Sequence, residues 1–313
     1  MAGIFDGSVP VEGADVRAIP IVQPMEVFSR MLERDEFDVA EMSLTHCYAL
    51  TVNRTARFVV LPVFPSRMFR HGFVFVNAAS GIREPRDLAC KRIGVQGYQM
   101  TAAVWIRGFL REDYDVDFGA AEWFEGGVNE RGVPGGSATS LRPAGGARIG
   151  PAGAGSTLSE LLATGELDAL IGAVKPSSYR LNGPVTRLFP NYPEIERQTF
   201  LATGVHPIMH ALVMRRELYE REPWLAASLY RACETAKQRA LAAMRFTASL
   251  RYMLPWLIAD LEEIDDVFGA DPWPYGLEAN RPTLEAFGRH MVADGFLDAP
   301  PALDDIFVAA EAG

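Results

Sequence analysis

Residues 91–111 read KRIGVQGYQMTAAVWIRGFLR, a short apolar strand that leads through a polar turn into an amphipathic helix. We expect the strand at 92–95 and the start of the helix at Thr101, whose hydroxyl is a good N-cap. The free N–H groups at such a helix start attract anions, so a carboxylate or phosphate could bind beside Tyr98 and Gln99. An ordinary capped strand–turn–helix without a ligand explains the segment too, and the glycine and lysine spacing of a Walker loop is absent.

The same alternation of short apolar segments and amphipathic segments extends along the chain and predicts an α/β fold. The expected strands are rich in β-branched and aromatic residues, as buried parallel strands are, and cover residues 57–61, 73–77, 92–95, 169–174 and 211–214. The expected helices cover residues 24–34, 101–112, 157–163, 223–246 and 283–294.

Two distant segments share one pattern: residues 31–43 read MLERDEFDVAEMS and residues 161–173 read LLATGELDALIGA. Each has a helix end, a short break and an Asp before an apolar strand. In the second unit, Thr157 and Glu160 have the spacing of a capping box and Gly165 stands at the expected C′ position. The similarity arises from duplication or from chance. Two such units predict two similar lobes with a ligand cleft at the ends of their strands.

The length of 313 residues gives a soft prior of two domains, and 49% apolar and 22% charged residues are ordinary for a globular chain. Residues 126–155 (GGVNERGVPGGSATSLRPAGGARIGPAGAG) are dense in Gly, Pro and Ser and predict a long loop or insertion without a helix or strand. The net charge of −10 argues against broad binding of nucleic acid or anionic membranes, although a local basic pocket could still hold a small anion.

Cys47, Cys90 and Cys233 are odd in number and far apart, without the C-x-x-C spacing of a zinc or redox site, which fits a reducing compartment. No apolar run approaches the roughly 18 residues that span a bilayer. The first residues lack the basic and apolar segments of a secretory signal. We therefore expect a soluble cytoplasmic protein with neither a membrane nor a nucleic-acid partner.

Residues 41–46 (EMSLTH) follow an expected strand and bring Glu41, Ser43 and His46 within one short segment. A carboxylate and an imidazole at this spacing could share proton transfer. The alternative is structural: Ser43 caps a helix, and His46 lies in the core or at the surface.

Residues 62–71 (PVFPSRMFRH) hold two prolines and should form a loop. Arg67 and Arg70 could grip a carboxylate there, because a guanidinium offers two parallel hydrogen bonds, with His71 beside them. The alternative is a pair of solvated loop charges.

Residues 203–210 (TGVHPIMH) place His206 and His210 four residues apart, which on a helix would suit a metal. Pro207 argues against a regular helix and no H-E-x-x-H pattern is present, so we expect no metal site and keep metal binding as the lesser alternative. The motifs of a nucleophile elbow, an EF-hand and a dinucleotide site are absent, so hydrolase-triad and dinucleotide functions have no support.

A series of longer segments follows in order along nearly the whole chain. They are FDVAEMS (37–43), PVFPSRMFRH (62–71), GVQGYQMTAAVWIRGFL (94–110), GELDALI (165–171), RLFPNY (187–192), TGVHPIMH (203–210), LPWL (254–257) and WPYGLEANRPTLEAF (273–287). Together they resemble the 4,5-dihydroxyphthalate decarboxylase family, which is related in fold to type II periplasmic solute-binding proteins.

The resemblance implies a two-lobed, type II periplasmic-binding-protein-like α/β fold with a ligand cleft between discontinuous lobes. Lobe one would hold residues 1–90 and 208–313. Lobe two would hold residues 91–207, including the 126–155 insertion. The chain would cross between the lobes at residues 71–77 and 206–214.

The resemblance also implies a reaction, the non-oxidative loss of carbon dioxide from 4,5-dihydroxyphthalate to give 3,4-dihydroxybenzoate. The substrate-binding candidates are then Ser43, Arg67, Arg70, Tyr98, Gln99 and Thr101. An acid must protonate the ring carbon that loses carbon dioxide, and Glu41, His71 and His210 are unranked candidates for it. Because the phenol supplies the electrons, no pyridoxal, flavin or thiamine cofactor is obligatory.

Three departures from the family bear on these expectations. Members of the family usually open with a further strand and loop before the segment that here begins MAGIFDG. His206 stands at a position where family members more often have an apolar aromatic residue. The 126–155 loop is longer and less regular than the resemblance leads us to expect. The alternative function is a solute-binding protein of the ABC-transporter type, which captures an aromatic carboxylate without chemistry, or else a sensor or idle paralogue. A small aromatic carboxylate is the expected ligand, and association into a homo-oligomer is compatible with the sequence.

Overall fold

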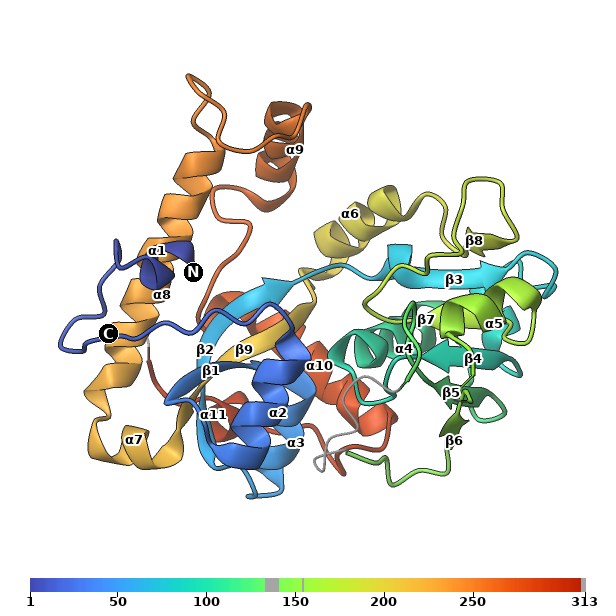
Figure 1. The fold of residues 1–313 in the computed structure, drawn as a ribbon, viewed down its shortest axis with the longest axis horizontal. Helices are drawn as coiled ribbons and strands as arrows, with labels where there is room; N and C mark the ends of the chain where they lie inside the picture. The colour runs from blue at the N-terminus through green and yellow to red at the C-terminus, as the bar shows by residue number, and fades with distance from the viewer. Residues whose placement is uncertain (133–140, 154, 311–313) are drawn as a thin grey trace.

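Two β-sheets organise the chain into two α/β lobes that lie side by side (Figure 1). The structure is a computed structural model and describes residues 1–132, 141–153 and 155–310. The three-stranded sheet has the order β1-β9-β2, and the six-stranded sheet has the order β6-β5-β4-β7-β3-β8. The predicted two-lobed α/β fold is confirmed.

The strands of the first sheet are β1 (Val39–Ser43), β9 (Ile208–Arg215) and β2 (Phe58–Arg67), and β9 runs antiparallel to both neighbours. Those of the second sheet are β6 (Arg148–Pro151), β5 (Glu122–Glu125), β4 (Arg92–Val95), β7 (Ala169–Ile171), β3 (Val74–Asn77) and β8 (Val185–Arg187). Strands β4, β5, β6 and β7 pair in parallel, whereas β3 is antiparallel to β7 and β8. Parallel pairing was therefore wrong for β2, β3 and β9, because strands next to a crossing between the lobes return in the opposite direction.

The helices confirm the expected helical segments to within two residues. They are α1 (Ala2–Phe5), α2 (Pro24–Arg34), α3 (Leu44–Val52), α4 (Thr101–Tyr114), α5 (Leu158–Thr164), α6 (Tyr192–Thr203), α7 (Arg216–Arg221), α8 (Trp224–Met244), α9 (Leu257–Phe268), α10 (Arg281–Ala293) and α11 (Leu303–Ile306). Short 3-10 turns are η1 (His71–Phe73), η2 (Pro85–Leu88) and η3 (Glu278–Asn280). Among these described helices, none combines the length and the apolar character needed to cross a membrane.

The chain passes between the lobes in two segments. The first crossing, residues 68–73, leads from β2 to β3, and the second, residues 204–207, leads from α6 to β9. They run side by side, and the Met68 N–H donates to the Pro207 carbonyl over 3.0 Å. Lobe one was expected to reach residue 90, but β3 pairs within the second sheet. We therefore propose that the first boundary lies at the first crossing.

Helix α4 lies between the lobes and contributes to both cores. Residues 101–110 are all buried. Trp105 packs into the core of the first sheet, whereas Ile106 and Leu110 pack into the core of the second. Its buried residues are mostly apolar, and the buried Arg107 among them is paired with Asp294. The 91–111 segment therefore joins the two lobes through a shared element.

Two segments expected as loops contain strands. Strand β2 continues to Arg67 through two prolines, because it lies at a sheet edge, where a missing N–H is tolerated, and its register shifts between Leu61 and Ser66. Strand β6 lies within the expected 126–155 loop and pairs with β5. A strand of this length is too short for its alternation of apolar and polar residues to be recognised in the sequence, and it forms because it pairs with β5, which is remote in the chain. Residues 133–140 and 154 of that expected loop lie outside the described residues.

The two similar segments fold alike. In the second, Thr157 accepts from the Glu160 N–H over 3.1 Å while Glu160 accepts from the Thr157 N–H over 2.8 Å, so the predicted capping box is confirmed. Gly165 ends α5 with a φ of 82°, and Asp35 ends α2 in the same left-handed region with a φ of 48°. Each unit then enters a strand, β7 in one lobe and β1 in the other.

Candidate functional site

The starts of helices α3 and α4 meet between the lobes. Thr101 Oγ1 lies 2.9 Å from Ser43 Oγ and 3.1 Å from Thr45 Oγ1, and it accepts from the Thr45 N–H over 3.3 Å. Thr101 is therefore not the N-cap that we expected: Met100 holds that position, and the Thr101 hydroxyl bonds across the lobe boundary instead. The positive ends of two helices converge here, which favours an anion nearby.

Glu41 and His210 form a hydrogen-bonded pair beside this junction. Glu41 Oε1 lies 2.5 Å from His210 Nδ1, and the two side chains are 36% and 18% exposed. Ser43 lies opposite His210 in the antiparallel register, and Glu41 is two residues earlier, so the three share one face of the sheet. We call Glu41, Ser43, Thr101 and His210 the cleft site. Its accessible carboxylate–imidazole pair can take up and release a proton.

Arg67 is bound by the protein itself. It is buried at the end of β2 and donates to the Pro274 carbonyl over 2.7 Å, to Asn280 Oδ1 and to the His206 carbonyl. Of the three guanidinium nitrogens of Arg67, only Nε has no hydrogen-bond partner among the described residues. Burial lowers the pKa of Arg67 to about 9. Its contacts tie β2 to the segment before α10, so it is not the open clamp that we expected.

Arg70 is buried as well, but its donors are largely unused. Neither Nε nor Nη1 has a hydrogen-bond partner among the described residues, and the guanidinium lies over the Phe73 ring at 5.0 Å. Burial lowers the pKa of Arg70 to about 10, an effect that the nearby Glu196 opposes. Ser66 lies opposite His210, and Arg70 follows Ser66 by four residues, at most about 14 Å along an extended backbone. Because an unpaired buried charge is costly, Arg70 is suited to receive an anion.

Tyr98 does not reach the cleft site. Its ring is buried, with the Arg107 guanidinium 3.7 Å from its centroid and the Trp123 ring edge-on at 5.2 Å. Burial raises the pKa of the Tyr98 hydroxyl. Gln99 is partly exposed in the turn before α4, so of these two predicted substrate contacts it alone is open to a ligand.

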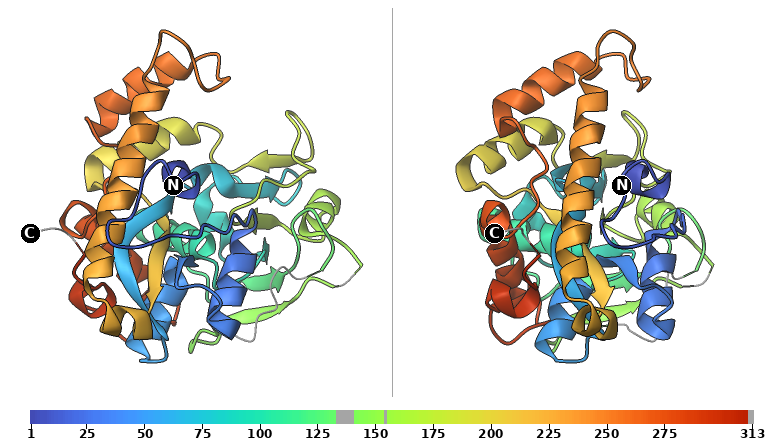
Figure 2. Two further views of the ribbon diagram at one scale, coloured as in Figure 1. Left: turned by 60° about the vertical axis from the view of Figure 1, so that its left-hand side comes forward. Right: turned by 90° about the vertical axis from the view of Figure 1, so that its left-hand side faces the viewer.

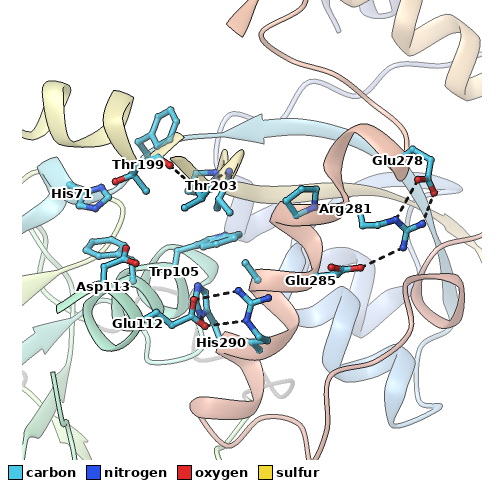
Figure 3. A pocket seen from close by; sticks show the side chains of 17 residues that line it. His71, Trp105, Glu112, Asp113, Thr199, Thr203, Glu278, Arg281, Glu285 and His290 are labelled. Atoms are coloured by element: carbon cyan, nitrogen blue, oxygen red, sulfur yellow. Dashed lines mark hydrogen bonds and ion pairs between the residues drawn. The ribbon is translucent and has the colours of Figure 1, made fainter. Parts of the chain in front are cut away.

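His71 lies apart from the cleft site, in the wall of a cavity of about 550 Å³ (Figure 3). The first crossing, α4, α6 and α10 line this cavity, with Trp105, Glu112, Thr199 and His290 among the lining residues. No residue of the cleft site belongs to the described lining. The structure therefore unites Glu41 with His210 and separates both from His71.

Glu196 of α6 was missed by the sequence analysis. Its Oε1 lies 3.8 Å from His71 Nδ1 and accepts from the Gly72 N–H over 3.3 Å. Burial raises the pKa of Glu196 to about 7 and lowers the pKa of His71 to about 4. His71 also stacks on the Phe109 ring, with centroids 4.0 Å apart. No motif marks Glu196, since its environment is made by residues remote in the chain.

His206 and His210 do not form a shared site. The His206 ring stacks on Phe69 with centroids 4.7 Å apart, whereas His210 pairs with Glu41. Within residues 1–132, 141–153 and 155–310, no group of three or more His, Cys, Asp or Glu side chains is placed to hold a metal ion.

Three buried histidines should make the fold sensitive to acid. Burial lowers the pKa of His71 to about 4, of His206 to about 3 and of His290 to about 4. Between the ordinary histidine value of about 6.5 and these values, the unfolded chain binds more protons, so stability falls as the pH falls. Glu196 acts in the opposite direction: because its pKa is raised to about 7, the folded protein binds one proton there that the unfolded chain does not bind in this pH range. Near pH 5.5 we expect the free energy of unfolding to drop by about 2 kcal/mol per pH unit.

Urea unfolding at several pH values between neutral and mildly acidic measures this slope. His206→Phe keeps the stack on Phe69 and removes one titrating ring. The variant should therefore lower the slope of the unfolding free energy against pH by about 1.4 kcal/mol per pH unit, the contribution of one proton. An unfolding free energy that does not change over this range would contradict the assignment of neutral, buried rings.

No family model matches the chain. The sequence is 35% identical over 296 residues to a 4,5-dihydroxyphthalate decarboxylase of Comamonas testosteroni, a match that covers 94% of this chain and 89% of the relative. It is 36% identical over 181 residues to a 4,5-dihydroxyphthalate decarboxylase of Pseudomonas putida, covering 58% of this chain and 69% of that one.

Solved structures with a similar course of the chain were found as well. A putative periplasmic sulfonate-binding protein SsuA of Methylobacillus flagellatus superposes with a TM-score of 0.48 at 12% identity, covering 90% of this chain and 75% of the other. The desulfurization enzyme DSZB superposes with a TM-score of 0.43 at 16% identity, covering 90% and 87%.

Proposed function

Because the chain belongs to the 4,5-dihydroxyphthalate decarboxylase family, we propose that it is a carboxy-lyase that removes carbon dioxide from a hydroxylated aromatic dicarboxylate. The proposed reaction converts 4,5-dihydroxyphthalate into 3,4-dihydroxybenzoate. The structural observation that carries the proposal is the Glu41–His210 hydrogen bond beside the converging starts of α3 and α4. It supplies a proton-transfer pair where an anionic substrate is favoured.

Recognition of the substrate depends on its two adjacent carboxylates. The buried Arg70 offers unused N–H donors and can bind one carboxylate through charge-assisted hydrogen bonds. The helix starts at the cleft site favour negative charge beside the Glu41–His210 pair. Gln99, partly exposed before α4, is placed to hydrogen bond a ring hydroxyl or carboxylate.

The proposed chemistry moves one proton onto the ring and breaks one carbon–carbon bond. The hydroxyl oxygen para to the departing carboxylate donates electron density into the ring as it loses its proton. The carbon that bears that carboxylate takes a proton from the Glu41–His210 pair. The bond to the carboxylate then breaks, its electron pair restores the aromatic ring, and carbon dioxide leaves. The proton that the hydroxyl released to water returns to it, and the Glu41–His210 pair takes one proton from water in place of the one left on the ring carbon. Hydrogen bonds to the hydroxyls would stabilise the charge that develops on the ring.

The deciding experiment mixes the purified full chain with 4,5-dihydroxyphthalate and follows release of carbon dioxide together with formation of 3,4-dihydroxybenzoate. Repeated turnover is the expected result. Phthalate, which lacks the hydroxyls, is the matched control and should bind without reacting. Saturable binding of 4,5-dihydroxyphthalate with no product would instead favour a solute-binding protein.

The two arginines of residues 62–71 should respond differently to truncation. Arg70→Ala should weaken substrate binding at least about tenfold with little loss of stability, because it removes a charge-assisted partner of the substrate, while within the described residues Nε and Nη1 make no protein hydrogen bond and the guanidinium only lies over the Phe73 ring. Arg67→Ala should chiefly lower the unfolding temperature, because it leaves Asn280 Oδ1 and the Pro274 carbonyl without their donor. Calorimetric titration and thermal unfolding measure the two effects. If wild type and Arg70→Ala bind the substrate with equal affinity, Arg70 does not bind the substrate carboxylate.

A further inference from the structure

Helix α2 packs on strand β1, an edge strand of the first sheet (Figure 1, Figure 2). The buried side chains of this helix are Phe28 and Met31. Phe28 is 4% exposed, and its ring meets the His210 ring edge-on, with centroids 5.0 Å apart and an angle of 82° between the two planes. Helix α2 therefore reaches the cleft site through an aromatic contact.

The His210 ring is held from two directions. Glu41 of β1 bonds Nδ1 over 2.5 Å, which fixes one atom of the ring but leaves the ring free to turn about that bond. The perpendicular contact with Phe28 fixes the plane of the ring, because an edge-to-face arrangement is favoured between two aromatic rings. The bond to Glu41 and the contact with Phe28 together define the orientation of His210.

The bond to Glu41 also decides which nitrogen of His210 can deliver a proton. An ionised carboxylate accepts hydrogen bonds and cannot donate them, so the hydrogen of the 2.5 Å contact belongs to Nδ1. Nε2 has no hydrogen-bond partner within the described part of the chain, and a second proton taken up by the ring is carried there. Delivery of that proton to the substrate carbon leaves a neutral imidazole that still donates to Glu41.

The similar segment of the other lobe shows that packing a helix on this kind of strand does not need a ring. Residues 161–173 correspond to residues 31–43, so Leu158 of α5 corresponds to Phe28 of α2. Leu158 is fully buried in the core of its own lobe. Because an aliphatic side chain serves there, core packing alone does not account for the aromatic ring at position 28.

We propose that Phe28 is a positioning residue for His210, whose imidazole it holds so that Nε2 faces the substrate carbon that takes up the proton. The inference rests on the proposed function, in which His210 supplies that proton. Phe28 is buried and acts through His210. The orientation matters because a proton is transferred efficiently only when donor and acceptor lie within hydrogen-bond reach and are aligned.

Kinetics and substrate titration of two variants of α2 test the proposal. Phe28→Leu gives α2 the residue that α5 carries, and it should lower kcat about ten- to a hundredfold while the dissociation constant of 4,5-dihydroxyphthalate stays within about twofold. Met31→Val is the matched control, because Met31 lies in the same core, so the variant should lower the unfolding temperature similarly and leave kcat unchanged. A wild-type kcat in Phe28→Leu, or an equal loss in Met31→Val, overturns the proposal.

Nuclear magnetic resonance of the full chain with isotope-labelled histidine tests the positioning without any turnover. Comparison with His210→Gln identifies the His210 signals. The Nδ1 hydrogen held by Glu41 should exchange with water more slowly in wild type and Met31→Val than in Phe28→Leu, where the ring can turn. Equal exchange in wild type and Phe28→Leu overturns the inference. A wild type without turnover contradicts the proposed function instead, and the exchange comparison still decides whether Phe28 positions His210.

Discussion

His210→Gln should lower kcat for decarboxylation about 10²–10⁴-fold, the range expected when a positioned proton-transfer group is removed. The glutamine amide keeps a hydrogen bond to Glu41 but cannot deliver a proton to the ring carbon. Glu41→Gln should produce a similar loss, because the two side chains share one contact of 2.5 Å. Single-turnover measurements of product formation, together with substrate titration, separate loss of chemistry from loss of binding.

His71→Phe is the matched comparison for this prediction. His71 was an equal candidate for the ring acid, yet its ring stacks on Phe109 and lies in the wall of the separate cavity. We expect its replacement to change kcat by less than about tenfold, well below the loss for His210→Gln. If His71→Phe were the more damaging variant, the proton would come from the His71–Glu196 pair and the cleft-site assignment would be wrong.

Asp294→Asn should destabilise the fold by about 3–5 kcal/mol, because it leaves the Arg107 charge buried without its anion. Arg107 and Asp294 are fully buried and 2.5 Å apart, and Arg111 bonds the same carboxylate over 2.6 Å. Arg107 also donates to the Tyr98 carbonyl over 2.8 Å, so it fixes the turn that precedes α4. The unfolding temperature should fall by on the order of 10 °C.

An exposed ion pair gives the control for this second prediction. Arg86 and Asp115 are 2.6 Å apart but 65% and 76% exposed, so Asp115→Asn should change stability by less than about 1 kcal/mol. The double variant Arg107→Met/Asp294→Leu removes both buried charges together and should be more stable than Asp294→Asn alone. A stability loss no greater for Asp294→Asn than for Asp115→Asn would show that the buried pair does not hold α4 to the segment after α10.

Local chemistry made some elements predictable from the sequence. The capping box of Thr157 and Glu160 and the glycine at 165 place α5 within a few residues, because caps and turns depend on near neighbours in the chain. The 91–111 segment defines β4 and α4 in the same way. The sequence predicted an amphipathic helix, whereas residues 101–110 of α4 are buried on all sides by the two lobes.

Other elements depend on partners that the local sequence does not contain. Strand β6 lies in a glycine-rich stretch and exists through its pairing with β5. Strand β2 passes through two prolines because it pairs on one side with β9. Arg67 and Arg70 are close in the chain and of one residue type, yet one is held by Asn280 and the other is unpaired. No local pattern separates such cases.

The sequence by itself determined the alternation of strands and helices, the family, and a short set of residues able to do chemistry. Only the tertiary structure decided which of them act together. Glu41 and His210 are 169 positions apart, and the antiparallel register of β1 and β9 brings them into contact. That register, like the burial that sets the pKa of His71, is made by contacts between remote segments. Composition and local periodicity do not encode such contacts, so the site had to be read from the fold.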